Sequence, residues 1–332
     1  MTVISSEIRF RAEEKVFPLK RAFRISRGEK TEARVVHVTL SCGGHEGRGE
    51  AVPYPRYGET VEGVIADIEA MEGALQAGLD REGLLEAMTP GAARAAIDLA
   101  LWDLEAKAAG QPVWQLAGLP EPKPVTCAET IVLDSPDRMA EAAREARSTL
   151  LKLKLGGPED MQRLKAVHAA APEAKLILDA NEGLSPEDFR AIARDAAGFG
   201  VVLIEQPFPA GKDDALKRFA APVAICADES VHTLRDLDDL AQKYDAVNVK
   251  IDKAGGLTAA LELVRGARAA GLHVMVGCMV GSSLSMAPAV LLAGLADAAD
   301  LDGPLWLAGD VPNGLRYENG EVHPPRPALW GG

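Results

Sequence analysis

After Gly118 the chain alternates short apolar runs with amphipathic stretches, and this alternation limits the choice of folds more than any other feature of its 332 residues. Apolar runs separated by single helices predict parallel strands joined by right-handed crossovers. Eight candidate strands are Thr126–Val132, Leu150–Leu155, Leu176–Asp179, Val201–Glu205, Val223–Ala227, Ala246–Ile251, His273–Gly277 and Asp300–Asp302. Eight such units in this length indicate an α/β fold, a TIM-type barrel over residues 118–310.

The residues before Gly118 have a different pattern, which predicts a separate α+β domain over residues 1–117. The expected strands are Ile4–Phe17 and Arg34–Ser41, and the expected helices are Val61–Ala77 and Thr89–Ala109. Thr89 suits an N-cap, Pro90 the first helical position and Gly110 the position after the helix.

Two segments of this first domain carry more charge or stiffness than a connecting loop needs. The stretch Arg21–Gly28 is basic and ends in glycine, and Pro53–Gly58 contains two prolines, two tyrosines and an arginine. A solvated loop is the ordinary interpretation of each. The alternative is that both are lids over a site, the first of them binding an anion.

The candidate strand Leu150–Leu155 carries two lysines where a buried strand should carry none. Lys152 and Lys154 project to the same face, because strand side chains alternate. Two neighbouring ammonium groups repel each other, which lowers the affinity of each for its proton. Alone, the pair is more simply explained as the wet face of an amphipathic strand.

Polar residues recur at the carboxyl ends of the following strands, where a barrel builds its active site. They are Lys154, Asp179 with Asn181, Glu205, Asp228 with Glu229, and Lys250. Asp179, Glu205 and Asp228 are each about one β/α unit apart, so three carboxylates from adjacent strands would converge. Any one of them could be a helix cap or a surface residue. Together they predict a site for a hard cation such as Mg²⁺.

The order of the strands places Lys154 before the three carboxylates and Lys250 after them. Around a closed barrel the two lysines would therefore flank one metal. A base on each face of a carbon suits removal of a proton from one side and its return from the other. The metal would stabilise an enediolate, so such a site inverts a stereocentre next to a carboxylate.

Composition excludes several other classes of function. With 36 basic against 49 acidic residues the net charge is −13, which disfavours a nucleic-acid or anionic-membrane partner. No apolar run is long enough to span a bilayer and the first residues lack signal-peptide features, so we expect a cytoplasmic protein. Cys42, Cys127, Cys226 and Cys278 lack metal-ligand spacing and are expected to be reduced. A homo-oligomer is left open.

These motifs, taken in order, resemble the enolase superfamily in its muconate-lactonizing-enzyme-like branch. The matching pieces are Lys-x-Lys at 152–154, Asp-Ala-Asn at 179–181, Ile-Glu-Gln-Pro at 204–207, Ala-Asp-Glu-Ser at 227–230 and Lys-Ile-Asp-Lys-Ala-Gly-Gly-Leu at 250–257. The resemblance covers the whole chain. It implies a modified TIM-type (β/α)7β barrel, an N-terminal α+β capping domain and a C-terminal segment, residues 311–332, that returns to the capping domain.

Within that branch, the Asp-Leu-Asp of residues 300–302 resembles the Asp-x-Asp of dipeptide epimerases. The resemblance implies that Asp300 and Asp302 hold the α-ammonium group of a dipeptide. Similarity to L-Ala-D/L-Glu epimerases appears in Ile-Ser-Arg-Gly at 25–28, Pro-Tyr-Pro-Arg-Tyr-Gly at 53–58 and Gly-Cys-Met at 277–279. A basic residue would then bind the glutamate side chain, with Arg27 the first choice and Arg24 or Arg56 the alternatives.

The resulting hypothesis is a Mg²⁺-dependent epimerase of L-Ala-L-Glu and L-Ala-D-Glu, in a setting of cell-wall peptide recycling. Asp179, Glu205 and Asp228 would hold the metal, and Lys154 and Lys250 would exchange the α-proton. Lys152 would hold the substrate carboxylate, while Asn181, Glu229 and Asp252 would support the ligands. The alternatives are an N-acylamino acid racemase, a muconate-type cycloisomerase and, more remotely, a non-catalytic binding or structural protein.

Overall fold

The computed structural model describes residues 8–332, and its N-terminal part is a three-stranded antiparallel sheet. The strands are β1 (Arg9–Ile25), β2 (Gly28–Cys42) and β3 (His45–Ala51). The expected strand Ile4–Phe17 begins outside the described residues. The expectation of a loop over Arg21–Gly28 is wrong. Phe23, Arg24 and Ile25 pair with Lys30, Glu29 and Gly28, so the basic stretch forms the tip of a long hairpin.

Helices follow the sheet: η1 (Pro55–Tyr57), α1 (Val61–Glu69), α2 (Glu72–Gln76), α3 (Arg81–Ala87), α4 (Ala92–Ala109) and α5 (Val113–Leu116). The single helix expected over Val61–Ala77 is wrong. The chain tightens between α1 and α2, where Met71 N bonds to the carbonyl of Ile68, three residues back.

Helix α4 begins later than the sequence predicts. Thr89 is not its N-cap; Gly91 holds that position, and the carboxylate of Glu59 accepts the Ala92 amide at 2.7 Å. A carboxylate from a distant segment thus replaces the local cap. The predicted end is confirmed, because Gly110 adopts the left-handed conformation, with φ 63°.

The remainder of the chain forms an eight-stranded parallel sheet in the order β12-β11-β10-β9-β8-β7-β6-β5. A parallel bridge between Cys127 and Ala299 joins the two edges and closes the barrel. The strands are β5 (Glu129–Ile131), β6 (Leu150–Lys154), β7 (Lys175–Asp179), β8 (Val201–Glu205), β9 (Ala224–Ala227), β10 (Ala246–Val249), β11 (His273–Gly277) and β12 (Ala298–Asp300).

Two strands, β10 and β12, end two residues earlier than expected, and both ends affect the site. β10 stops at Val249, and Lys250 is the N-cap of α10 (Ile251–Ala254). β12 stops at Asp300, and Asp302 precedes the short helix η5 (Gly303–Trp306) instead of lying in the strand. Asp300 and Asp302 therefore do not share a strand face.

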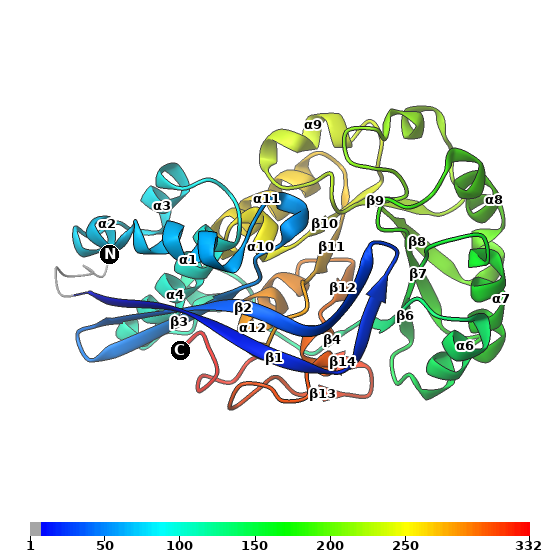
Figure 1. Ribbon diagram of the computed structural model, residues 1–332. Coiled ribbons are helices and arrows are strands. Elements are labelled where there is room, and N and C mark those ends of the chain that lie inside the picture. Colours follow the sequence, from blue (N-terminus) through cyan, green and yellow to red (C-terminus); the bar gives the residue numbers. More distant parts are fainter. Residues whose placement is uncertain (1–7) are drawn as a thin grey trace.

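Helical segments connect the strands around the outside of the barrel (Figure 1). They are α6 (Pro136–Glu145), α7 (Asp160–Ala170), α8 (Pro186–Ala196), η2 (Ala197–Phe199), η3 (Asp214–Arg218), η4 (Leu234–Asp236), α9 (Leu237–Leu240), α10, α11 (Leu257–Ala269) and α12 (Ser283–Ala293). Inside the barrel, a buried apolar layer fills one end; it consists of Ala128, Leu150, Ile177, Leu203, Cys226, Ala246 and Met275. This layer supports the polar one above it.

Two long-range connections join the N-terminal sheet to the barrel. The β1–β2 hairpin extends over the barrel (Figure 1), where Leu133 N donates to the carbonyl of Arg24. At the other end of the chain, β13 (Tyr317–Glu318) pairs with β14 (Glu321–Val322), which in turn pairs with β4 (Val125–Thr126). The last residues return to α4, where Trp330 Nε1 donates to the carbonyl of Leu99. No helix within residues 8–332 has the length and apolar character needed to cross a membrane.

Candidate active site

Side chains two residues beyond the apolar layer form a polar layer at the carboxyl ends of the strands. They include Lys152, Asp179, Glu205, Asp228 and Asn248, all buried, because alternate strand residues point into the barrel. Above them lies a cavity of about 470 Å³ between the barrel and the hairpin. Its lining includes Lys152, Lys154, Asp228, Lys250, Asp300 and Asp302.

The lysines and carboxylates form a buried network of ion pairs. Lys152 Nζ lies 3.0 Å from Asp179, 2.8 Å from Glu205 and 2.7 Å from Asp300. Lys154 bonds to Asp179 at 2.6 Å. On the opposite flank, Lys250 bonds to Asp228 at 2.7 Å. The structure therefore places the two flanking lysines against different carboxylates, with Glu205 on the strand between them.

The expectation that repulsion lowers the proton affinity of Lys152 is wrong for this arrangement. Burial lowers the pKa of Lys152, but the charges of Asp179, Asp300 and Glu205 outweigh burial and raise it well above its usual value. The pKa of Lys250 is also raised, since Asp228 outweighs burial there. For Glu205, burial and the neighbouring Asp179 raise the pKa to about 7. The charges of the carboxylates therefore affect the pKa values of Lys152 and Lys250 more than the charge of a second ammonium group does.

The three predicted metal ligands fit a hard cation by their chemistry, although they are not preorganised around one. No cluster of three or more His, Cys, Asp or Glu side chains among residues 8–332 has the geometry of a metal site. Lysine ammonium groups lie against these carboxylates instead. The same region nevertheless holds buried oxygens without hydrogen-bond donors: Asn181 Oδ1, Glu229 Oε2, Asn248 Oδ1 and Asp300 Oδ1. Carboxylate and amide oxygens that need a positive partner match the preference of Mg²⁺.

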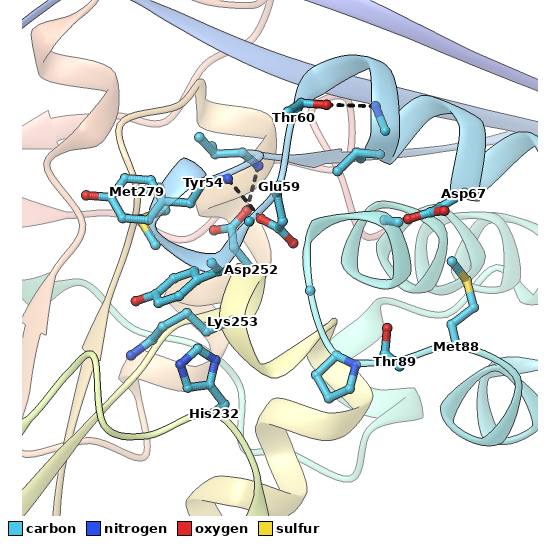
Figure 2. Close-up of a pocket in the computed structure, with 18 of the residues that line it drawn as sticks. Tyr54, Glu59, Thr60, Asp67, Met88, Thr89, His232, Asp252, Lys253 and Met279 are labelled. Atoms are coloured by element: carbon cyan, nitrogen blue, oxygen red, sulfur yellow. Dashed lines mark hydrogen bonds between the residues drawn. The ribbon is translucent and has the colours of Figure 1, made fainter. Parts of the chain in front are cut away.

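The three expected supporting residues lie in different places. Asn181 lines the cavity, and its main-chain amide donates to the Asp179 carboxylate at 3.0 Å. Glu229 also lines the cavity, but its carboxylate pairs with Arg27 at 2.7 Å. Asp252 accepts the Val52 amide at 2.7 Å and lines a second cavity, of about 550 Å³, together with Tyr54 and Glu59 (Figure 2). The structure does not bring Asp252 into the carboxylate layer.

Asp300 and Asp302 both line the cavity at the end of β12, three strands from β9, the strand that Asp228 follows. One oxygen of Asp300 pairs with Lys152, and the other has no hydrogen-bond partner. Asp302 accepts the Thr130 amide at 2.8 Å and the indole Nε1 of Trp306 at 3.2 Å. Burial and the charge of Asp300 raise the pKa of Asp302 to about 6. The two acids form one wall of the cavity, in which Asp300 Oδ1 lacks a hydrogen-bond donor.

The three candidate arginines differ in position and in their partners. Arg24 is exposed and pairs with Glu29, outside the cavity lining. Arg27 lines the cavity and contacts Glu229, Glu182 and the carbonyl of Asn181. Arg56 lines it too, and donates twice to Glu182, at 2.9 and 2.8 Å. Both cavity arginines are therefore engaged by carboxylates of the protein.

Lys30 is a cavity residue that sequence reasoning missed. It pairs across the hairpin with Phe23, so the two side chains share a face, and both line the cavity. Its ammonium lies 4.9 Å from the ring centre of Tyr54 and has no ion pair among residues 8–332. The position of Lys30 next to the basic stretch was the one indication in the sequence. It indicates a cavity residue only once the register of the hairpin is known.

Two further residues of the polar layer were also missed. Asn248 donates to Glu205 at 2.8 Å. Lys253 bonds to Asp228 Oδ1 at 2.6 Å and to its main-chain oxygen. The alternation of Asn248 and Lys250 repeats that of Lys152 and Lys154, and this repetition could have indicated Asn248.

Comparison with known proteins gives matches over nearly the whole chain. Residues 8–118 match the family model "Mandelate racemase / muconate lactonizing enzyme, N-terminal domain", and residues 136–328 match "Enolase C-terminal domain-like". L-Ala-D/L-Glu epimerase of Escherichia coli (strain K12) is 45% identical over 313 residues, 93% of this chain and 98% of the relative. N-acetyl-D-glutamate racemase of Pseudoalteromonas sp is 41% identical over 289 residues, covering 86% and 91% of the two chains.

Solved structures also match over nearly the whole chain. An enolase family member from Agrobacterium tumefaciens with homology to dipeptide epimerases, bound to sodium and L-Ala-L-Glu, is 52% identical with a TM-score of 0.95. The match covers 98% of this chain and 100% of that one. A dipeptide epimerase from Methylococcus capsulatus, in complex with Mg and L-Arg-D-Lys, is 31% identical with a TM-score of 0.89, covering 97% and 98%.

Proposed function

Because the chain belongs to the mandelate racemase and muconate lactonizing enzyme group of the enolase superfamily, we propose that it is a Mg²⁺-dependent dipeptide epimerase acting on L-Ala-L-Glu and L-Ala-D-Glu. The observation that carries the proposal is the placement of Lys154 and Lys250 on opposite flanks of three buried carboxylates, in a cavity that also contains Asp300 and Asp302. The similarity to L-Ala-D/L-Glu epimerase supports the choice of substrate.

In this proposal Asp179, Glu205 and Asp228 hold the metal. A divalent cation held there would supply the positive charge that these carboxylates otherwise take from the lysines, and it would offset charge developing on the substrate carboxylate. Lys154 takes the α-proton from one face, and Lys250 delivers a proton to the other. Lys152, which already contacts Asp179 and Glu205, holds the substrate carboxylate beside them.

Asp300 and Asp302 bind the α-ammonium group of the N-terminal residue. Asp300 has one buried oxygen without a donor, which an ammonium group would satisfy. At the other end of the substrate, Lys30 binds the side-chain carboxylate, together with Arg27 or Arg56. Lys30 needs to break no ion pair to do so, whereas Arg27 must leave Glu229 or Glu182. Arg24 would have to leave Glu29 and turn toward the cavity.

The test is proton NMR of L-Ala-L-Glu in D₂O with the enzyme and Mg²⁺. We expect loss of the glutamate α-proton signal, appearance of the second diastereomer, and abolition of both by EDTA. Lys154→Ala and Lys250→Ala should each stop epimerisation, while each retains solvent exchange of only one diastereomer, and not the same one. No exchange with this substrate or with a panel of L-Ala-L-X dipeptides would reject the epimerase assignment.

A second candidate is racemisation of an N-acylated glutamate, which the similarity to N-acetyl-D-glutamate racemase favours. An acylated substrate has no ammonium group for Asp300 and Asp302 to bind. Asp300→Asn separates the two functions: an epimerase loses its dipeptide activity, whereas a racemase of acylated substrates keeps its own. A muconate-type cycloisomerase has no comparable relative among the matches described above.

The proposal extends to the setting of the enzyme. We propose that residues 1–117 act as a cap that closes the cavity, that residues 311–332 tie this cap to the barrel, and that the protein works in the cytoplasm on peptides released from the cell wall. The net charge of −13 supports the absence of a nucleic-acid partner. A homo-oligomer is part of the same proposal, and light scattering measures it directly.

A further inference from the structure

Helix α4 of the N-terminal region directs three polar side chains at one point of the barrel. Arg94, Asp98 and Trp102 are spaced four residues apart, so they lie on one face of the helix. All three are buried, Arg94 being 5% exposed and Asp98 0%. Their common target is the junction between α10 and α11, residues 254–258. Buried charges of this kind need specific partners, and each has them.

Arg94 caps the end of α10. Its guanidinium donates to the carbonyl of Ala254 at 2.6 Å and to that of Gly255 at 3.0 Å. The remaining donors bond to the carbonyls of Leu85 and Met88. A cation is favourable at the C-terminus of a helix, where carbonyl groups lack partners.

Asp98 caps the beginning of α11, one helical turn further along α4. Its carboxylate accepts the Thr258 hydroxyl at 2.5 Å and the Thr258 amide at 3.2 Å. Trp102 Nε1 donates to the same hydroxyl at 3.0 Å. A cation and an anion of α4 thus hold the two helix ends that meet at this junction.

The two glycines of the junction are required by this close approach. Gly255 and Gly256 have φ values of 79° and 120°. A Cβ atom on Gly255 would lie 2.5 Å from Arg94, and one on Gly256 would lie 2.5 Å from Asp98. The Gly-Gly pair is therefore fitted to the two charged side chains, and not merely to a turn.

The clamped segment begins at Lys250. The carbonyl of Lys250 accepts the Ala254 amide at 2.9 Å, so the single turn of α10 connects the lysine directly to the carbonyls held by Arg94. We propose that Arg94 and Asp98 are positioning residues that hold Lys250, and with it Lys253, against Asp228. This inference rests on the proposed function, because it assigns Lys250 one of the two proton transfers.

The loop after Lys154 is held in a different way, which makes the inference specific to one face of the substrate. There, Asp160 accepts the amides of Gly156 and Gly157, and Arg163 contacts Asp160 at 2.9 Å. These partners all come from the barrel itself. Loss of the contacts that Arg94 and Asp98 of α4 make, which we call the α4 clamp, should therefore disturb Lys250 and leave Lys154 in place.

The experiment measures α-proton exchange of L-Ala-L-Glu and L-Ala-D-Glu separately in D₂O with Mg²⁺. Lys250→Ala first identifies which diastereomer depends on Lys250. Arg94→Met should then slow exchange of that diastereomer by about tenfold or more, because a displacement of about 1 Å costs up to about a hundredfold. Exchange of the other diastereomer should change by less than about twofold. Arg94→Lys should restore part of the loss, and Asp98→Asn should show the same asymmetry more weakly.

Arg48→Met is the matched control. Arg48 also belongs to the N-terminal region and donates to two main-chain carbonyls, those of Ala328 and Leu329, but it does not contact the junction. Its removal should leave the ratio of the two exchange rates unchanged. Equal slowing of both diastereomers by Arg94→Met and Asp98→Asn, or no slowing by either, would overturn the positioning role.

Amide hydrogen exchange provides a readout that does not need catalysis. In Arg94→Met, or in Asp98→Asn if the first variant does not fold, amides of residues 250–258 should exchange faster while those of residues 154–160 do not. Unchanged protection of residues 250–258 would reject the clamp. If the wild-type protein exchanges neither diastereomer, the proposed function fails, and the amide measurement still decides whether α4 holds this segment.

Discussion

Lys30 and Lys152 illustrate, at the scale of single residues, how surroundings assign different tasks to one side-chain type. Lys152 is enclosed by three carboxylates, which raise its pKa and fix it in place. Lys30 is exposed, rests on the ring of Tyr54 and remains available to a ligand at the cavity mouth. Lys152 therefore neutralises the buried carboxylates around it, whereas Lys30 is available to bind the side chain of a substrate.

We predict that Lys30→Met selectively weakens activity on substrates with an acidic side chain. A charge-assisted hydrogen bond contributes about 1.5–3 kcal/mol, so kcat/KM for L-Ala-L-Glu should fall by about ten- to a hundredfold. The value for L-Ala-L-Leu should be unchanged. Lys15→Met is the control, since Lys15 lies on the same hairpin and its ion pair within residues 8–332 is with Glu13. An equal fall for both dipeptides would contradict the recognition role.

Asp98 allows a prediction of pH dependence that is independent of catalysis. Burial raises the pKa of this carboxyl from 3.8 to about 6. Because the folded-state pKa is the higher one, the stabilising contribution is complete below pH 3.8 and is lost as the pH rises through 6. Relative to Asp98→Asn, the wild-type protein should lose about 3 kcal/mol of unfolding free energy between about pH 4 and pH 7.

Urea unfolding of the two proteins at several pH values measures this difference. The asparagine cannot ionise, so the variant serves as the reference in which only the other groups titrate. A difference between the two proteins that stays constant with pH would show that Asp98 titrates alike in the folded and unfolded chains.

At the scale of secondary-structure elements, the contact of β3 with α4 decides how the N-terminal sheet is held. Cβ atoms added at Gly47 and Gly49 would lie 2.2 and 2.1 Å from carbonyl oxygens of α4. The strand therefore packs against the helix backbone with no side chain between them. This close packing leaves the opposite face of α4 free to reach α10 and α11 through Arg94 and Asp98.

Gly49→Ala should consequently destabilise the protein by about 1–3 kcal/mol, because the nearest atoms belong to backbone that cannot move aside. The melting temperature, followed by circular dichroism, measures the loss. Gly73→Ala is the matched control: Gly73 lies in α2 with open space around it, and alanine there should stabilise by about 0.5–1 kcal/mol. A melting temperature of Gly49→Ala at or above that of the wild type would contradict the packing argument.

At the scale of the whole molecule, metal binding should be linked to folding, because Asp179, Glu205 and Asp228 come together only in the closed barrel. Mg²⁺ at about a hundred times its dissociation constant should add about 2.7 kcal/mol of stability and raise the melting temperature by several degrees. Asp228→Asn should lose most of this rise, whereas Asp214→Asn, an exposed aspartate, should keep it. An equal rise in both variants would argue against a metal site at Asp228.

The division between sequence and structure follows the range over which each interaction acts. The polar residues at strand ends could be predicted because strand alternation is local, and carboxyl ends of parallel strands must meet at one end of a barrel. Thr89 was misjudged because Glu59 acts from a distant segment, and the loop at Arg21–Gly28 was misjudged because residues 28–30 pair back onto residues 23–25 as a hairpin. Local preference gives way where a distant group satisfies the backbone better.

The sequence by itself thus determined the barrel, its family and the set of lysines and carboxylates that meet in it, since all of these depend on periodicity and strand order. Only the tertiary structure decided which cationic side chains line the cavity without an ion pair. It also decided that Asp252 lies outside the carboxylate layer and that Arg94 of α4 bonds to the segment that carries Lys250. These outcomes depend on contacts between residues far apart in the chain. No local pattern encodes the partner that a buried charge will find.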